Sequence, residues 1–208
     1  IVNILGSIDD KIENNEKIIV NLEKLQLQIF KNCENSINDF NVIQLSNYIR
    51  FIKGKKPIEN QSNLMNYLNI EGITTGNFSH KCATNMVLAN TEDILMVMDG
   101  ASSGTIYIGN KGIVSSTLAK IEVNCEKYRY LIFQKLKHME KKIKELNTGS
   151  AIPHANKDFI NSIKIKINNQ SEFVNKKLSE LTKIIISTKN ENLKLNHLKQ
   201  LYLKKFFG

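Results

Sequence analysis

The sequence of 208 residues contains no tryptophan, two prolines, three cysteines and no long apolar run. Cys33, Cys82 and Cys125 show no paired spacing, which favours reduced thiols over a disulfide framework. The longest apolar run, residues 94–98, is far shorter than the roughly 20 residues of a membrane span. No signal peptide is visible, so we expect a cytoplasmic protein without a membrane partner. Because Ile1 already lies inside a helical pattern, we expect that sequence is missing upstream.

The sequence also lacks the local motifs of common catalytic and cofactor sites. Its glycines do not fit the dinucleotide-binding pattern, and no Gly-Lys-Ser/Thr phosphate loop occurs. His80 and Cys82 have no second ligand pair at zinc spacing, and no serine or cysteine has an activation signature. Glu140 and Lys142 resemble part of a nuclease motif but lie on a predicted helix without an upstream acid. We therefore predict no catalytic residue, no metal site and no cofactor.

Positive charge is in excess but unevenly distributed. The formal net charge is +9, a balance that permits a polyanionic partner without proving one. Residues 1–34 carry four lysines against six acidic side chains, whereas residues 171–208 carry eight lysines against three glutamates. The terminal segments therefore have opposite net charge.

The two terminal segments share an apolar pattern at a spacing of 176 residues. The matching pairs are Leu5 with Leu181, Ile8 with Ile184, Leu22 with Leu198, Leu25 with Leu201, Leu27 with Leu203, and Phe30 with Phe206. The alternative interpretation is two unrelated amphipathic helices in a chain rich in Leu, Ile, Lys and Asn. Each copy predicts a helix roughly 40 Å long.

Apolar residues in both segments recur at alternating steps of three and four, which predicts coiled-coil seams. The predicted seam and partner-contact residues are Ile12, Asn15, Ile19 and Leu22 in the first helix, and Leu181, Ile185, Leu195 and Leu198 in the second. Asn15 and Asn192 interrupt the seams and can fix the register. We predict antiparallel packing, because both helices flank one insert and can bring its ends together.

The middle segment reads as a mixed α/β domain. Short apolar runs predict strands over residues 86–89, 94–98, 105–108, 113–114, 118–123 and 163–167, with a hairpin-type turn at 109–112 and a helix over 127–146. Residues 42–52 give a mixed signal, a short helix or a bent strand, and residues 60–80 are polar. The fold class predicted is α+β: helix 1–34, domain 35–169 and distal helix 170–208.

Cations and small polar side chains on the predicted loops are candidates for DNA contacts. Arg50, Lys53, Lys55 and Lys56 crowd a Gly/Pro turn where they could neutralise phosphates. Base edges could be reached from polar loops by Thr75, Asn77, Lys81, Ser102 and Ser103, and Lys111 completes the set. A solvated loop without a ligand is the competing interpretation at each position.

Several longer motifs are typical of one protein family. In the middle segment they are Asp99-Gly100-Ala101-Ser102-Ser103-Gly104-x-Ile106-Tyr107, Gly112-x-x-Ser115-Ser116-Thr117-Leu118-Ala119 and Thr148-Gly149-Ser150-Ala151-Ile152-Pro153-His154. In the helices they are Leu5-Gly6-Ser7-Ile8-Asp9-Asp10-Lys11-Ile12-Glu13-Asn14-Asn15 and Leu198-Lys199-Gln200-Leu201-x-x-Lys204-x-Phe206-x-Gly208. Together they resemble the DNA-specificity subunit of type I restriction-modification systems over essentially the whole chain. Asn168-Asn169-Gln170 replaces a turn that is often Pro-rich in the family, which leaves the exit geometry of the domain open.

The resemblance implies a non-catalytic subunit whose target-recognition domains each read one half of a split site in double-stranded DNA. It implies that the conserved helices pair antiparallel as a spacer and dock methyltransferase subunits, and that the complex recruits the restriction subunit. The family's order is domain, helix, domain, helix. This chain has helix, domain, helix, so it looks like the second half of such a subunit, or a half-subunit able to form a homodimer.

Two other functions compete with DNA recognition. One is an enzyme such as a nuclease with its own site, against which the lack of clustered acids or ligands argues. The other is a coiled-coil scaffold that binds protein and not DNA. Salt dependence separates DNA recognition from the scaffold, because phosphate contacts make affinity fall steeply with salt.

Overall fold

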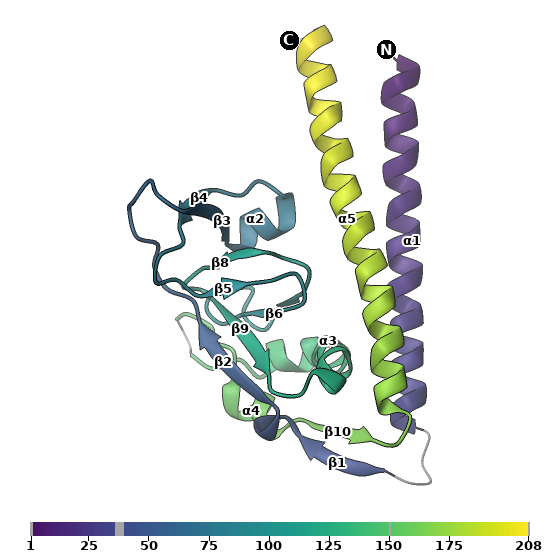
Figure 1. Cartoon of the computed structure of the whole chain (residues 1–208), viewed down its shortest axis with the longest axis vertical. Helices are drawn as coiled ribbons and strands as arrows, with labels where there is room; N and C mark the ends of the chain where they lie inside the picture. The colour runs from purple at the N-terminus through teal and green to yellow at the C-terminus, as the bar shows by residue number, and fades with distance from the viewer. Residues whose placement is uncertain (1, 36–39, 150, 208) are drawn as a thin grey trace.

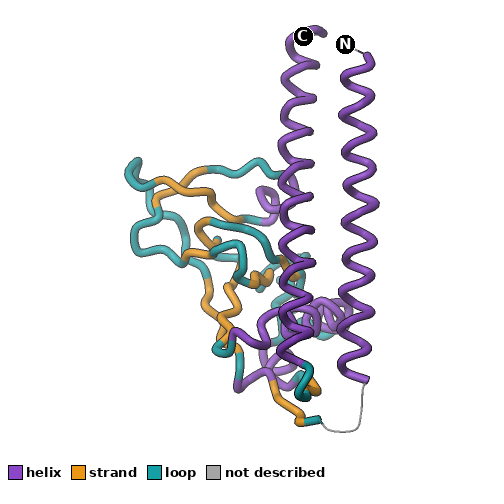
Figure 2. The backbone as a smooth tube through the Cα atoms, turned by 45° about the vertical axis from the view of Figure 1, so that its right-hand side comes forward, coloured by secondary structure: helices purple, strands orange, loops and turns teal. Residues whose placement is uncertain are grey.

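Two long helices and a mixed α/β domain make up the computed structural model, which describes residues 2–35, 40–149 and 151–207 (Figure 1). Helix α1 spans Val2–Asn35 and helix α5 spans Ser171–Phe207. The helices run side by side in opposite directions, with both chain ends at the end of the pair that projects beyond the domain (Figure 2). The predicted α+β class and the antiparallel helix pair are thus confirmed. Within the described residues, no helix has the length and apolarity needed to cross a membrane.

The helix pair is held by a seam that contains two polar layers. Ile8 and Ile19 of α1 are buried in this seam. The side-chain amide of Asn15 donates to Asn192 Oδ1 at 2.8 Å, and both residues are buried. Farther toward the domain, Gln26 Nε2 donates to the Thr182 hydroxyl at 2.7 Å. An unpaired buried amide is costly, so these layers favour the register in which each amide finds its partner.

The described part of the domain contains ten short strands and three helices. The strands are β1 (Asn41–Gln44), β2 (Ile49–Lys53), β3 (Leu64–Leu68), β4 (His80–Cys82), β5 (Leu88–Ala89), β6 (Ile94–Val97), β7 (Ile106–Tyr107), β8 (Gly112–Val114), β9 (Leu118–Val123) and β10 (Lys164–Ile167). The helices are α2 (Ile70–Thr75), α3 (Arg129–Glu145) and α4 (Lys157–Ser162), with short 3-10 turns at Leu45–Asn47 and Glu126–Tyr128.

The strands form three small sheets. One has the order β2-β9-β6-β7, the second β4-β3-β8-β5, and the third pairs β1 with β10. Every pairing is antiparallel except that of β3 with β8. Because β1 and β10 lie at the two ends of the domain sequence, their pairing closes the insert and brings the ends of α1 and α5 together.

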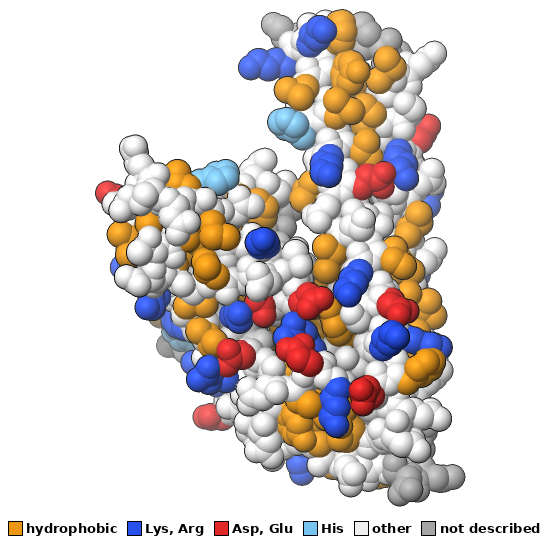
Figure 3. All heavy atoms as spheres, viewed as in Figure 1, with side chains coloured by type: hydrophobic (Ala, Val, Ile, Leu, Met, Phe, Trp, Pro, Cys, Tyr) orange, Lys and Arg blue, Asp and Glu red, His pale blue; other side chains and the backbone are white. Residues whose placement is uncertain are grey.

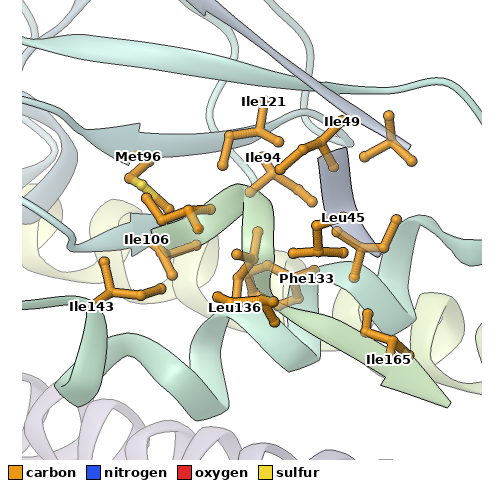
Figure 4. Packing of buried hydrophobic residues seen from close by; sticks show 14 of the residues in the cluster. Leu45, Ile49, Ile94, Met96, Ile106, Ile121, Phe133, Leu136, Ile143 and Ile165 are labelled. Atoms are coloured by element: carbon orange, nitrogen blue, oxygen red, sulfur yellow. The ribbon is translucent and has the colours of Figure 1, made fainter. Parts of the chain in front are cut away.

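The main core lies between the β2-β9-β6-β7 sheet and helix α3 (Figure 4). Ile94, Met96 and Ile121 come from the strands, and Leu136 and Ile143 come from α3; all five are almost fully buried. Their apolar surface is removed from water on both sides of the layer, which is the dominant favourable contribution to folding.

A smaller cluster fixes the domain to the helix pair. Phe30 of α1, Leu131 of α3 and Leu178 of α5 pack together and are almost fully buried. Asn175 of α5 accepts hydrogen bonds from the backbone N–H groups of Tyr130 and Leu131, so α5 caps the first turn of α3. The domain therefore meets both helices through a packed and hydrogen-bonded junction.

The sequence-based strand predictions are confirmed over most of the domain. The hairpin-type turn predicted at residues 109–112 is wrong, because β7 pairs with β6 whereas β8 pairs with β3 and β5, so this segment connects two different sheets. Residues 42–52 form parts of two strands that belong to different sheets and are joined by a 3-10 turn, so the segment is mostly extended but is neither one bent strand nor a short α-helix. Residues 60–80 contain β3, α2 and the start of β4, which the sequence did not predict. Strand β3 is only partly buried and contains Asn66, so it lacks the apolar run that marked the other strands.

Candidate nucleic-acid interface

Three predicted cations lie at and just beyond the end of β2. Lys53 is its last residue, and Lys55 and Lys56 follow on an exposed loop. Gly54 sets the path of this loop, because a Cβ atom there would lie 2.1 Å from the backbone oxygen of Ser115. A side chain at Gly54 is therefore excluded, and the loop stays against the sheet while Lys55 and Lys56 face solvent.

Lys53 belongs to a small charged cluster that spacing did not predict. Its Nζ lies 2.7 Å from Asp99 Oδ2, and His154 Nδ1 lies 2.7 Å from Asp99 Oδ1. Burial raises the pKa of Asp99, but the hydrogen bonds from Lys53 and His154 outweigh it and hold that pKa below its usual value. The charged carboxylate thus holds together β2 and two loops distant in sequence, and no local pattern marks the three residues as neighbours.

The loop after β6 contains the two predicted serines in different environments. Gly100 and Gly104 bound the turn with φ angles of 98° and 89°, a region that glycine adopts without strain. Ser102 is half-buried, with only its backbone oxygen in a hydrogen bond to Thr105. Ser103 is fully buried, and its hydroxyl accepts a 2.6 Å hydrogen bond from the Asn147 amide. In this conformation Ser102 is the serine closer to solvent, and Ser103 holds the loop on the segment that follows α3.

The remaining predicted residues lie elsewhere on the domain. Arg50 is exposed and pairs with Glu122 across the β2–β9 ladder at 2.6 Å. Lys81 lies on β4, and exposed Lys111 lies in the β7–β8 turn. The structure therefore groups Lys53, Lys55 and Lys56, and leaves the other cations dispersed.

Thr75 and Asn77 lie beside helix α5. The Thr75 hydroxyl donates to the Glu71 backbone and accepts from the backbone N–H of Asn77, so it stabilises the end of α2. Gly76 between them contacts Leu193 of α5. This loop therefore joins the domain to the projecting half of the helix pair, a proximity that no local pattern in the sequence reveals.

The chemistry of these surfaces is cationic and hydrogen-bonding. Among the residues that the structure describes, no group of three or more His, Cys, Asp or Glu side chains is arranged to hold a metal ion. Lysines on loops attract phosphates, and half-exposed hydroxyls and amides can reach base edges. The domain on its helix pair therefore presents the types of side chain that nucleic-acid contacts use.

Comparison with known proteins identifies the family to which the chain belongs. The family model of the type I restriction modification DNA specificity domain matches residues 37–200. The type I restriction enzyme MjaVIII specificity subunit of Methanocaldococcus jannaschii is 32% identical in an alignment 178 residues long, which covers 81% of this chain and 42% of that protein. The chain therefore belongs to the family of type I restriction-modification specificity subunits.

Solved structures share the fold. The S subunit from M. genitalium superposes with a TM-score of 0.71 at 18% identity, covering 99% of this chain and 59% of that one. The HsdS subunit from Thermoanaerobacter tengcongensis gives 0.55 at 13% identity, over 98% and 55% of the two chains. The chain thus spans about half the length of these relatives.

Proposed function

We propose that this chain reads a specific sequence in double-stranded DNA as one half of a bipartite target, and that its helix pair docks a methyltransferase subunit. The observation that carries the proposal is the match of a DNA specificity domain to residues 37–200. In this proposal the chain is the non-catalytic part of its complex, and the restriction subunit joins through that complex.

The lysines after β2 neutralise phosphates in this proposal. Lys55 and Lys56 are exposed, and neither is in a salt bridge within the part of the chain that the structure describes. Lys53 shares the same edge of the sheet, although Asp99 holds it. Arg50, Lys81 and Lys111 add positive charge around the domain and steer DNA without fixing sequence.

Base readout is assigned to side chains that solvent reaches. Half-buried Ser102 presents a hydroxyl and exposed Asn77 presents an amide, on two separate loops of the domain. Ser103 and Thr75 enter the proposal as residues that hold these loops, because their hydroxyls already have intramolecular partners. Hydrogen bonds to base edges carry the sequence information that phosphate contacts lack.

The sequence repeat supports a bipartite target. A shift of 176 residues places Asn15 at position 191, next to Asn192, and places Asn192 at position 16, next to Asn15. The repeat therefore exchanges the two members of the Asn15–Asn192 pair to within one residue. The same shift carries Phe30, which is buried against the domain, to Phe206, which is 42% exposed at the projecting end. A second recognition domain, from a longer chain or a second copy, would cover Phe206 as this domain covers Phe30.

Methyltransferase docking is assigned to exposed apolar side chains of the helix pair. Ile4, Ile18 and Leu25 of α1 and Ile184 and Leu201 of α5 are each 45–52% exposed. Hydrophobic side chains gather near the projecting end of the pair in the surface view (Figure 3). Apolar side chains at helical spacing are the anchors by which one helix binds another.

A selection of random duplex DNA by this chain, with its methyltransferase subunit present, tests the proposal. An enriched motif supports recognition, and enrichment of a spaced inverted pair also indicates two copies in the complex. Salt-sensitive binding without an enriched motif contradicts sequence readout. Failure to bind DNA at all favours a protein-binding scaffold.

Two variants then separate phosphate contact from base contact. Lys55→Ala/Lys56→Ala should weaken binding to all sequences alike and lower the salt slope by about 1.8, at about 0.9 per phosphate. Ser102→Ala should change the selected motif. Lys176→Ala/Lys177→Ala is the matched control, because it removes the same charge from exposed positions near the start of α5. An unchanged slope in the first variant rejects the phosphate assignment.

A further inference from the structure

A cleft of about 460 Å³ separates the recognition domain from the projecting half of α5. Its domain wall is the loop that carries Thr75 and Asn77. The two walls meet where Gly76, in a left-handed conformation with φ 79°, lies against Leu193; a Cβ atom on this glycine would lie 2.6 Å from Leu193 Cδ2. Above that contact the walls diverge, and the surface view shows a hollow beside the helix pair (Figure 3).

The helix wall of this cleft is basic and polar. Lys194, His197 and Gln200 line it. From Leu193, the positions four, seven and eleven residues farther along α5 share one helical face, which places Lys204 above His197 and Gln200. Within residues 2–35, 40–149 and 151–207, neither Lys194 nor Lys204 has a carboxylate at salt-bridge distance. Both cations are therefore available to a ligand.

Charge is divided between the two helices in this projecting half. Beyond Leu193, α5 carries four lysines and no acidic residue, whereas residues 2–16 of α1 carry four acidic side chains and one lysine. Lys199 points across the pair and binds Asp9 at 2.5 Å. The acids thus lie on the helix away from the domain, and the uncompensated lysines lie on the helix beside it. An anion entering the cleft meets positive charge on its helix wall.

We propose that this wall of α5 binds backbone phosphates of the duplex immediately beside the half-site read by the domain. This inference rests on the DNA recognition proposed above and assigns to the spacer helix a DNA contact of its own. Lys194 and Lys204 lie roughly 15 Å apart along the helix axis, from a rise of about 1.5 Å per residue. A major groove is about 12 Å wide, so the two lysines can reach phosphates on both of its sides. The Asn77 amide adds a neutral donor on the opposite wall.

The test is the salt dependence of binding by Lys194→Ala/Lys204→Ala, measured on the full chain with its methyltransferase subunit and a duplex carrying the selected motif. Loss of two phosphate contacts should lower the salt slope by about 1.8. The advantage of the unmodified chain should therefore shrink roughly tenfold between about 50 and about 200 mM salt. The selected motif should not change. The matched control is again Lys176→Ala/Lys177→Ala, about 27 Å down the same helix from Lys194.

A second duplex, trimmed on the spacer side of the half-site, locates the contact. On trimmed DNA the cleft variant and the unmodified chain should bind equally. An unchanged slope on long DNA, or an equal decrease in the control, overturns the inference while leaving DNA recognition intact. Weaker binding of the methyltransferase subunit with unchanged DNA affinity would instead assign these lysines to an acidic protein surface. If the unmodified chain selects no motif, the proposed function itself has failed.

Discussion

Ser102 and Ser103, adjacent residues in the loop after β6, lie in different environments. Ser103 is fully buried and bonded to Asn147, whereas Ser102 has a half-exposed side chain. Ser103→Ala should lower the free energy of unfolding by about 1–3 kcal/mol, because it removes a buried hydrogen bond and leaves the Asn147 amide with only the Ser103 backbone oxygen as an acceptor. Ser102→Ala should stay within about 0.5 kcal/mol. Urea unfolding measures both, and equal values would contradict this division.

Glu140 links stability to pH. It accepts hydrogen bonds from Lys137, Lys144 and the backbone N–H of Ile106. Burial raises the pKa of Glu140, but the two lysines outweigh it and bring that pKa below its ordinary value. A depressed carboxyl pKa stabilises the fold above the unfolded value of about 4.3, and this contribution is lost as pH falls through the folded pKa.

Glu140→Gln should therefore lower the free energy of unfolding by about 1–3 kcal/mol at neutral pH, as expected for hydrogen bonds to a charged group. The difference from the unmodified chain should shrink as the pH falls below about 4. Unfolding curves across pH measure this, with Glu145→Gln as the control because Glu145 is 59% exposed and pairs only weakly with Lys141. A difference independent of pH would show that shape, not charge, is responsible.

At the scale of elements, the Asn15–Asn192 layer sets the register of the helix pair. Asn192→Ala leaves the buried Asn15 amide with only Glu191 as an acceptor, and Asn15→Ala leaves the buried Asn192 oxygen without its donor. Each should cost about 1–3 kcal/mol. The double variant should cost less than the sum, with a coupling of about 0.5–3 kcal/mol. Thermal or urea unfolding of the unmodified chain, the two single variants and the double variant completes this double-mutant cycle. Asn14→Ala, at an exposed neighbouring position, is the control. Strict additivity would mean that the two amides act independently.

The elements that were predicted correctly from the sequence are those whose apolar residues follow a regular pattern. Ile8, Asn15 and Ile19 follow the predicted seam and are buried, and the strands around Met96 are continuous apolar runs. On α5 the buried positions include Thr182, which the seam prediction omitted, while Leu198 is 41% exposed. Threonine can be buried here because Gln26 supplies its hydrogen-bond partner from the other helix, which no local pattern reveals.

The candidate interface was only partly predictable for the same reason. The lysines after β2 are adjacent in sequence, so their grouping could be anticipated. The contacts of Lys53 and His154 with Asp99 depend on how β2 and two separate loops come together. The placement of Thr75 and Asn77 against α5 depends on how the whole domain docks. Long-range packing, not residue type, decides both.

At the scale of the molecule, the two ends of the helix pair should respond differently to equivalent substitutions. Phe30→Ala removes a fully buried ring and should cost about 3–5 kcal/mol. Phe206→Ala should change the stability of the isolated chain little, because the ring is 42% exposed. In a complex with two recognition domains, Phe206→Ala should weaken assembly. Urea unfolding measures the stability of both variants, and light scattering with the methyltransferase subunit measures the assembly of Phe206→Ala. Unchanged assembly would show that a second domain does not contact Phe206.

The separation of acidic α1 from basic α5 gives the projecting half of the pair an electric moment directed across its long axis. A body with such a moment rotates in the field of a polyanion before it makes any contact. Here the positive side is the side that carries the domain. The protein would approach DNA already turned with its reading face forward, so fewer encounters are wasted and the gain falls on the rate of association. Added salt screens that field within about 10 Å at 0.1 M, and would slow target finding before it loosened the bound complex.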